Sequence, residues 1–173
     1  MRFKLLALAL LTTLNLQAVT IGKAPKEVTI SGDNGGIAKD SSAWSSSMIK
    51  DKVYVVFYVD PDEKDVNEAF NKALKAKNYK TKGDYSTIAI VNLAATWKPN
   101  FVIEKILASK QKEFPDTTYV KDKNKVLVKE WDLADDSSDI LVFDKSGKVV
   151  FYKAGKMSDE DTQKAFKVIE ENL

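Results

Sequence analysis

The sequence predicts a single α/β domain in which a mixed β-sheet carries helices on both faces. Two runs, residues 53–59 and 88–93, are rich in β-branched residues and largely lack polar alternation. Strands of this kind are covered on both faces. Helix-spaced apolar residues follow each run, which supplies the covering layers. At 173 residues the chain is long enough for one domain with a hydrophobic core, since domains most often have about 100–150 residues.

The first 18 residues have the features of a secretion signal. Arg2 and Lys4 give a positive start, an apolar run extends from Leu5 to Leu14, and Ala18 offers a small residue for cleavage. A run of about 10 apolar residues is too short to span a bilayer of about 30 Å as a helix. We therefore expect a signal peptide at 1–18, a domain at 19–173, and an exported protein without a stable membrane anchor.

Several classes of function are excluded by composition. The chain has no cysteine and no histidine, so it cannot supply a thiolate, a disulfide, a zinc site of the usual ligands or an imidazole base. Arg2 is the only arginine and lies in the predicted signal with Lys4, so residues 19–173 have 25 basic and 25 acidic residues. We expect no nucleic-acid partner, because the side chain best suited to phosphates and guanine is missing.

The sequence also predicts a hairpin before the first core strand and a helix after each of the two core strands. Residues 31–47 contain turn residues and a serine cluster, which predict an N-terminal β-hairpin and a surface loop before the first core strand. Helical spacing predicts a helix over 66–77 after that strand. A second helix follows Pro99, which is tolerated in a first helical turn, and ends near Pro115.

The C-terminal third is predicted to contain three strands and a helix. A strand is expected around 126–128, and strands at 140–143 and 149–152, joined by Asp144-Lys145-Ser146-Gly147, form a hairpin. Ser158 caps a final helix whose first turn is acidic. The order βαβα followed by a β-hairpin and a helix is that of a thioredoxin-like fold.

Three segments resemble one family of bacterial proteins. They are Tyr85–Asn92, Glu130–Ser138 with its Trp-x-Leu and Asp-Asp-Ser-Ser sequences, and Val142–Lys148. The chain from about residue 52 to its C-terminus resembles the YtfJ family of exported bacterial proteins. The resemblance implies a thioredoxin-like fold in the periplasm of a Gram-negative cell, and no established activity. Members are often labelled transcriptional regulators, a role that an exported chain with one arginine does not favour.

The chain lacks the residues on which the redox chemistry of thioredoxins depends. In that superfamily a CxxC motif follows the first core strand, and this chain has Asp60-Pro61-Asp62-Glu63-Lys64 there. The cis-proline that normally precedes the third core strand would fall near Ser137 or Ser138. We therefore expect a thioredoxin-like protein without redox activity and without a cofactor.

Asp60 and Asp62 also allow a different hypothesis. Two carboxylates one residue apart at the end of a strand are how haloacid-dehalogenase-type phosphatases present a nucleophile and an acid-base group beside Mg²⁺. In that interpretation Thr96 binds phosphate, Lys110 neutralises it, and the metal is held by Asp60, Asp62, Asp135 and Asp139. A Mg²⁺-dependent phosphatase is the alternative to a binding protein.

The segment 135–139 has two interpretations as well. Its three carboxylates and two hydroxyls are hard oxygen ligands that suit Ca²⁺ or a partner, or they satisfy backbone N–H groups before a buried strand. Among the tryptophans, Trp131 is expected in the core and Trp97 at the surface. We expect a binding surface for a periplasmic protein or peptide at one end of the sheet, where loops that follow different strands meet. Its residues are Asp60, Pro61, Asp62, Thr96, Trp97, Asp135, Asp136, Ser137 and Ser138.

Overall fold

The computed structural model describes residues 18–173, and the predicted signal peptide lies almost entirely outside the described residues. A six-stranded sheet forms the middle layer, with the strand order β2-β6-β5-β4-β7-β8, and β1 pairs with β3 in a separate two-stranded sheet. The strands are β1 (Thr29–Ile30), β2 (Gly35–Ile37), β3 (Trp44–Ser45), β4 (Val53–Val59), β5 (Tyr85–Asn92), β6 (Thr117–Asp122), β7 (Ser138–Phe143) and β8 (Val149–Lys153). The helices are α1 (Glu68–Lys77), α2 (Asn100–Glu113), α3 (Val126–Trp131) and α4 (Asp159–Asn172).

The sheet is mixed, as predicted. β4 pairs in parallel with β5 and antiparallel with β7, β5 pairs in parallel with β6, and β8 pairs antiparallel with β7. The predicted hairpin of 140–143 and 149–152 is β7 and β8. Asp144 closes its turn by accepting hydrogen bonds from the backbone N–H groups of Ser146 (2.8 Å) and Lys148 (2.9 Å).

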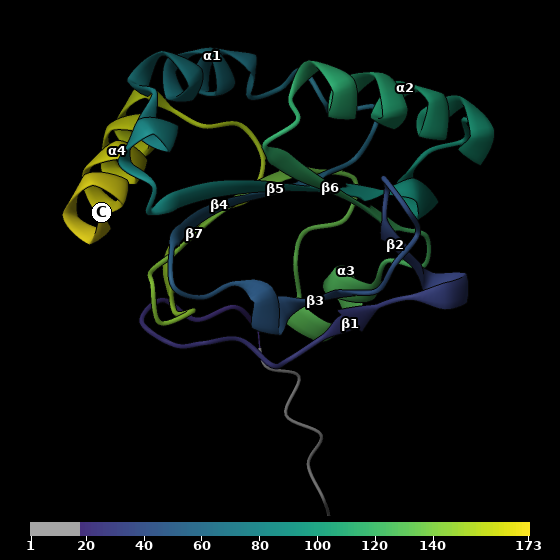
Figure 1. Ribbon diagram of the computed structural model, residues 1–173, viewed down its shortest axis with the longest axis horizontal. Helices are drawn as coiled ribbons and strands as arrows, with labels where there is room; N and C mark the ends of the chain where they lie inside the picture. Colours follow the sequence, from purple (N-terminus) through teal and green to yellow (C-terminus); the bar gives the residue numbers. More distant parts are fainter. Residues whose placement is uncertain (1–17) are drawn as a thin grey trace, which may run out of the picture.

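Helices cover both faces of the sheet, and side-chain alternation in β4 explains why (Figure 1). Val53 and Val55 pack with α1 and α4 in one cluster, whereas Val56 and Tyr58 pack with α3 and the N-terminal strands in another. α2 covers β5 and β6 on the same side as α1, through Ile103 and Leu107. An α/β sandwich of this kind confirms the predicted class.

The final helix begins as the sequence predicts. The Ser158 hydroxyl accepts a hydrogen bond from the backbone N–H of Asp161 (3.0 Å), and the Asp161 carboxylate accepts one from the backbone N–H of Ser158 (3.1 Å). This reciprocal pair is a capping box, which satisfies two donors that the helix itself leaves free. Ala165 and Ile169 are buried on the inner face of α4.

The strand predicted around 126–128 is wrong: these residues begin α3. The preceding strand is β6, which the sequence analysis did not predict because Thr117–Asp122 mixes threonines, Lys121 and Asp122 with only two apolar residues. Asp122 is buried and turns the chain from strand to helix. Its carboxylate accepts hydrogen bonds from the backbone N–H groups of Val126 (2.9 Å) and Leu127 (3.1 Å) and from the Tyr58 hydroxyl (3.1 Å).

The N-terminal segment is also more than a hairpin with a surface loop. β1 and β3 pair antiparallel, but β2, between them in sequence, joins the main sheet beside β6. Gly35 has φ of 121°, and a Cβ there would lie 1.9 Å from the Lys121 carbonyl oxygen, so only glycine allows β2 to approach β6. Trp44 is fully buried against Trp131 rather than lying in an exposed loop.

Candidate functional site

Three parallel strands end side by side at one end of the sheet. The register pairs Val59 with Val91 and Asn92 with Asp122, so Asp60, Asn92 and Asp122 are neighbours there. β7 runs antiparallel to β4, and Ser138 at its start pairs with Val59. The loop 135–137 therefore arrives at the same place. We call this end of the sheet, with the loops 60–63, 92–98 and 135–138, the carboxyl edge.

Asp60 is a buried carboxylate, with 3% of the residue exposed. Its carboxylate accepts a hydrogen bond from the backbone N–H of Asp62 (2.8 Å), and its own N–H donates to the carbonyl of Ser137 (2.8 Å). Burial raises the pKa of Asp60 to about 6, reinforced by the nearby charges of Asp136 and Glu63, while Lys98 opposes the rise. A carboxylate of this kind loses its proton within the physiological pH range.

Asp62 lies in a different environment although it is only two residues away. The Thr96 hydroxyl donates a hydrogen bond to one carboxylate oxygen of Asp62 (2.7 Å), and the Lys98 ammonium pairs with the other. These contacts join the loop after β4 to the loop after β5. Asp62 is thus neutralised by a cation, whereas no ion pair is formed by Asp60 within the described residues.

A second ion pair crosses the carboxyl edge. The Asp135 carboxylate accepts hydrogen bonds from the Asn92 amide (3.1 Å), the Lys125 ammonium (2.5 Å) and the backbone N–H of Asp136 (3.1 Å). Burial opposes ionisation of Asp135, but the hydrogen bonds from Lys125 and Asp136 hold its pKa below the usual value. Asn92 is 1% exposed, and its amide oxygen has no hydrogen-bond partner within the described residues.

The residues that follow Asp136 hold the loop in place. Buried Asp139 accepts hydrogen bonds from the Ser137 hydroxyl (2.7 Å), the backbone N–H of Ala134 (2.9 Å) and the Tyr152 hydroxyl (3.1 Å). Ser138 is buried as well, and its hydroxyl accepts a hydrogen bond from the Asn67 amide (3.2 Å). Of the two interpretations of 135–139, the structural one therefore accounts for Ser137, Ser138 and Asp139.

The geometry does not support the phosphatase hypothesis. Asp139 is occupied by three donors, Asp62 is paired with Lys98, and Asp135 is paired with Lys125. Residues 18–173 contain no group of three or more His, Cys, Asp or Glu side chains that could hold a metal ion. Lys110 pairs with Glu113 near the far end of α2, so it does not face the carboxyl edge.

The tryptophans separate into buried and exposed residues. Trp131 is fully buried, as predicted, and its indole N–H donates to the carbonyl of Lys26 (2.8 Å). Trp97 is 86% exposed and lies beside Lys98, whose ammonium is 5.7 Å from the centre of the indole ring. The carboxyl edge therefore combines an exposed aromatic ring, Trp97, with several carboxylates.

Four polar partners at this end of the sheet were not predicted from the sequence. They are Asn92, Lys98, Asp122 and Lys125. Asn92 had a signal in the sequence, because it is the one polar residue in the predicted buried run 88–93. Lys125 had none, since its role depends on α3 replacing the predicted strand.

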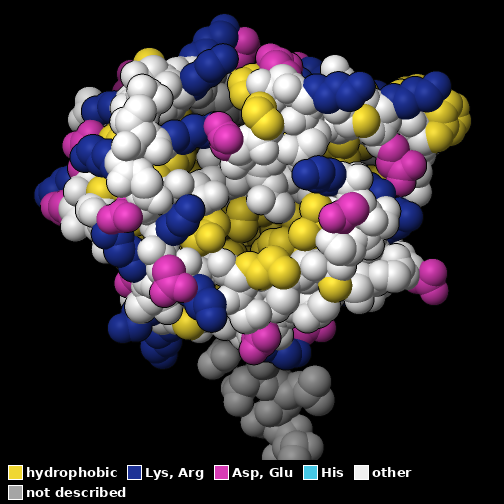
Figure 2. All heavy atoms as spheres, in the orientation of Figure 1, with side chains coloured by type: hydrophobic (Ala, Val, Ile, Leu, Met, Phe, Trp, Pro, Cys, Tyr) yellow, Lys and Arg dark blue, Asp and Glu magenta, His cyan; other side chains and the backbone are white. Residues whose placement is uncertain are grey.

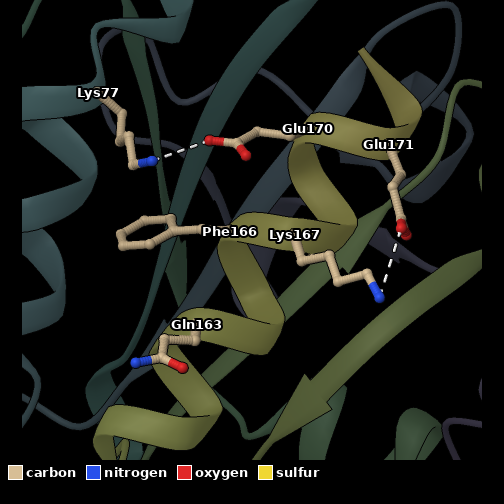
Figure 3. A pocket seen from close by; sticks show the side chains of 6 residues that line it. All are labelled: Lys77, Gln163, Phe166, Lys167, Glu170 and Glu171. Atoms are coloured by element: carbon tan, nitrogen blue, oxygen red, sulfur yellow. Dashed lines mark hydrogen bonds and ion pairs between the residues drawn. The ribbon is translucent and has the colours of Figure 1, made fainter.

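A hollow of about 440 Å³ lies elsewhere, between α4 and the end of α1 (Figure 3). In it the Phe166 ring stacks on Phe70 with a centroid distance of 5.5 Å, and Lys77 pairs with Glu170 (2.9 Å). The hollow is wide and shallow, and none of the predicted site residues lines it. It therefore adds nothing to the carboxyl edge.

Solved structures with a similar architecture include a thiol peroxidase, a thiol-disulfide oxidoreductase and a thioredoxin. A thiol peroxidase from Chromobacterium violaceum matches with a TM-score of 0.64 and 11% identity, over 90% of this chain and 88% of that one. The thioredoxin domain of a thiol-disulfide oxidoreductase from Bacteroides vulgatus matches with a TM-score of 0.61 and 13% identity, over 87% and 97%. The pneumococcal exposed lipoprotein thioredoxin Etrx1 from Streptococcus pneumoniae matches with a TM-score of 0.54 and 15% identity, over 84% and 99%.

Fold and site together define a thioredoxin-like protein that has no cysteine and carries aspartates after its first core strand. Two curated relatives are similar in sequence. An uncharacterised protein of Haemophilus influenzae is 32% identical over 130 residues, which cover 73% of this chain and 70% of the relative. The uncharacterised protein YtfJ of Escherichia coli K12 is 28% identical over 133 residues, or 75% and 72%.

The model of the family described as "Bacterial protein of unknown function (YtfJ_HI0045)" matches residues 17–172. The chain belongs to this family, which confirms the resemblance seen in the sequence.

Proposed function

We propose that this protein is a non-enzymatic binding or accessory protein of the periplasm, and that the carboxyl edge is its binding surface. The observation that carries the proposal is Asp60. It is buried at the position where thioredoxins follow their first core strand with a CxxC motif, it forms no ion pair within the described residues, and its pKa is about 6. A charge kept buried at a cost to stability is typical of functional sites.

The charges around Asp60 indicate the chemistry of the partner. Asp62 and Asp135 are balanced by Lys98 and Lys125, but Asp136 and Glu63 form no ion pair within the described residues, so the edge retains negative charge. A basic segment of an exported protein or peptide would complement that charge. Trp97, which is exposed beside the same loops, offers the aromatic anchor that interfaces commonly use.

Three observations support the proposed cellular location. The features of residues 1–18 predict export, and no helix among residues 18–173 is long and apolar enough to cross a membrane. One structural relative is an exposed lipoprotein of another bacterium. Cell fractionation tests the location directly: recovery of a shortened chain from the periplasm is expected, and an intact chain in the cytoplasm would overturn this part of the proposal.

Capture of partners from a periplasmic extract tests the binding surface. Proteins retained by immobilised wild type are quantified against Trp97→Ala, Asp136→Lys and a control, Glu171→Lys, which makes the same charge change on α4. We expect one set of partners to be lost at least tenfold with Trp97→Ala and Asp136→Lys and kept by the control. Equal retention by all variants would remove the carboxyl edge as the binding surface.

An activity assay tests the rival function. Purified protein is incubated with Mg²⁺ and a generic phosphomonoester, beside Asp60→Asn. We expect no turnover above the buffer rate. Turnover that Asp60→Asn abolishes would replace the binding role by phosphatase activity.

A further inference from the structure

The outer face of α2 is exposed, aromatic and basic. Phe101 is 61% exposed, and Lys105, Ala108 and Lys112 follow at spacings of four, three and four residues, which places all four on one side of the helix. Ile103 and Leu107, which are buried against the sheet, lie on the opposite side. Trp97, three residues before the helix, extends the exposed face at its beginning. We call Trp97, Phe101, Lys105 and Lys112 the α2 face.

The charge of the α2 face is of one sign. The two acidic residues of α2 are each neutralised by a lysine: Glu104 pairs with Lys121 (3.4 Å) and Glu113 with Lys110 (2.9 Å). Lys105 and Lys112 form no ion pair within residues 18–173. The face therefore presents two uncompensated positive charges beside two exposed rings, and a complementary surface has to be anionic.

The exposed rings of this region each have a lysine beside them. Figure 2 shows hydrophobic and lysine side chains projecting together at the corner of the molecule where α2 begins. The Lys105 ammonium lies 5.7 Å from the centre of the Phe101 ring, as Lys98 does from Trp97, so each exposed ring has a cation beside it. Aromatic rings and lysines in this combination are characteristic of protein surfaces that settle at the headgroup level of a bilayer.

We propose that the α2 face docks reversibly onto an anionic lipid surface, with the two rings at the headgroup level and Lys105 and Lys112 facing lipid phosphates. This inference goes beyond the proposed function, because it concerns the outer side of α2 and a different class of partner; Trp97 is the residue that the two surfaces share. Two rings and two lysines give weak, salt-dependent attachment, unlike a membrane-spanning anchor. Such attachment would keep the carboxyl edge close to a membrane while leaving Asp60 and Asp136 free for a protein partner.

The tryptophans provide the readout. Trp44 and Trp131 are fully buried, so acrylamide in solution quenches mainly Trp97. The purified protein is mixed with vesicles of phosphatidylethanolamine and phosphatidylglycerol, or of phosphatidylcholine alone. We expect the anionic vesicles to lower acrylamide quenching at least twofold and to shift the emission to the blue, and the neutral vesicles to change neither. The effect should disappear in 1 M salt.

Two double variants with the same change in charge identify the face. Lys105→Glu with Lys112→Glu should weaken vesicle binding at least tenfold, whereas Lys23→Glu with Lys129→Glu, at exposed positions away from α2, should have a much smaller effect. Phe101→Ser should weaken binding without a change in charge. All variants keep the residues of the carboxyl edge, so failure here leaves the proposed function standing.

Three results would overturn the proposal. The first is unchanged Trp97 quenching with anionic vesicles at low salt. The second is equal loss of binding by the two double variants, which would indicate attraction by net charge alone. The third is a response of Trp97 to poly-glutamate but not to vesicles, which would assign the α2 face to an acidic polypeptide.

Discussion

Replacing Asp60 by asparagine should stabilise the protein at neutral pH. The pKa of Asp60 rises from its ordinary value of 3.8 to about 6 because the carboxylate is buried near Asp136 and Glu63. A difference of one pH unit corresponds to about 1.4 kcal/mol, so the ionised form costs about 3 kcal/mol of stability at neutral pH. An amide keeps an oxygen that can accept the hydrogen bond from the Asp62 N–H. We expect Asp60→Asn to raise the free energy of unfolding at pH 7.5 by about 1–3 kcal/mol.

The sign of the pH dependence follows from the same shift. Between pH 4 and 6 the native state holds the Asp60 proton more tightly than the unfolded state does, so the free energy of unfolding falls as the pH rises. Below this range the group is protonated in both states and the cost disappears. The advantage of Asp60→Asn over wild type should therefore be small at pH 4, grow through pH 6 and level off above pH 7.

Urea unfolding at several pH values, followed by tryptophan fluorescence, measures this difference. Titrating groups far from Asp60 are common to both proteins and cancel in the comparison. Asp33→Asn, the same substitution at an exposed carboxylate outside any described ion pair, serves as a control because it removes no buried charge. Either of two results would refute this reasoning. The first is a difference in unfolding free energy between Asp60→Asn and wild type that does not change with pH. The second is a loss of stability of Asp60→Asn, relative to wild type, when the pH is raised from 4 to 7.5.

Three further substitutions test the packing around the site by the same unfolding assay. Asn67→Ala removes the amide that donates to the Ser138 and Gly155 carbonyls (3.1 and 3.0 Å) and accepts from the Met157 N–H (2.8 Å), so it should cost about 2–4 kcal/mol. Its exposed neighbour Asn71→Ala should cost less than about 0.5 kcal/mol, and a similar cost for both would mean that the buried bonds contribute little. Trp131→Phe should cost about 1–2 kcal/mol more than Trp44→Phe, because only the Trp131 indole N–H has a partner within the described residues; equal costs would contradict this. Ser158→Ala should cost about 1 kcal/mol through loss of the capping box, and Ser158→Asp, which keeps a cap, should recover most of it.

Local patterns predicted those elements whose signal lies within a few residues. The apolar runs of β4 and β5, the hairpin of β7 and β8, and the Ser158 cap are local signals of this kind, and each was confirmed. β6 could not be found in this way, since its Lys121 and Asp122 become buried only through distant partners. Lys121 reaches Glu104 of α2, and Asp122 reaches Tyr58 of β4.

The same distinction applies to the candidate site: several of its residues could be predicted from the sequence, but their charge states could not. Asp60, Asp62 and Thr96 were recognisable because they follow predicted strands, and parallel strands end at one edge of a sheet. Asp135 reaches the same edge for another reason, since the strand predicted before it is α3 and the antiparallel strand β7 begins just after it. The charge states of these carboxylates could not be predicted, because a carboxylate is free or neutralised according to which cation the fold brings within reach. Asp62 meets Lys98 and Asp135 meets Lys125, while Asp60 is left buried without an ion pair.

The sequence by itself determined the α/β class, the family, and the absence of thiol and imidazole chemistry, since these depend on local pattern and residue content. Only the tertiary structure decided which carboxylate stays charged at a cost, and that Phe101 remains exposed beside Lys105, which forms no ion pair within the described residues. The reason is physical. Burial and Coulomb interactions depend on distances between residues far apart in the chain, which the sequence does not contain.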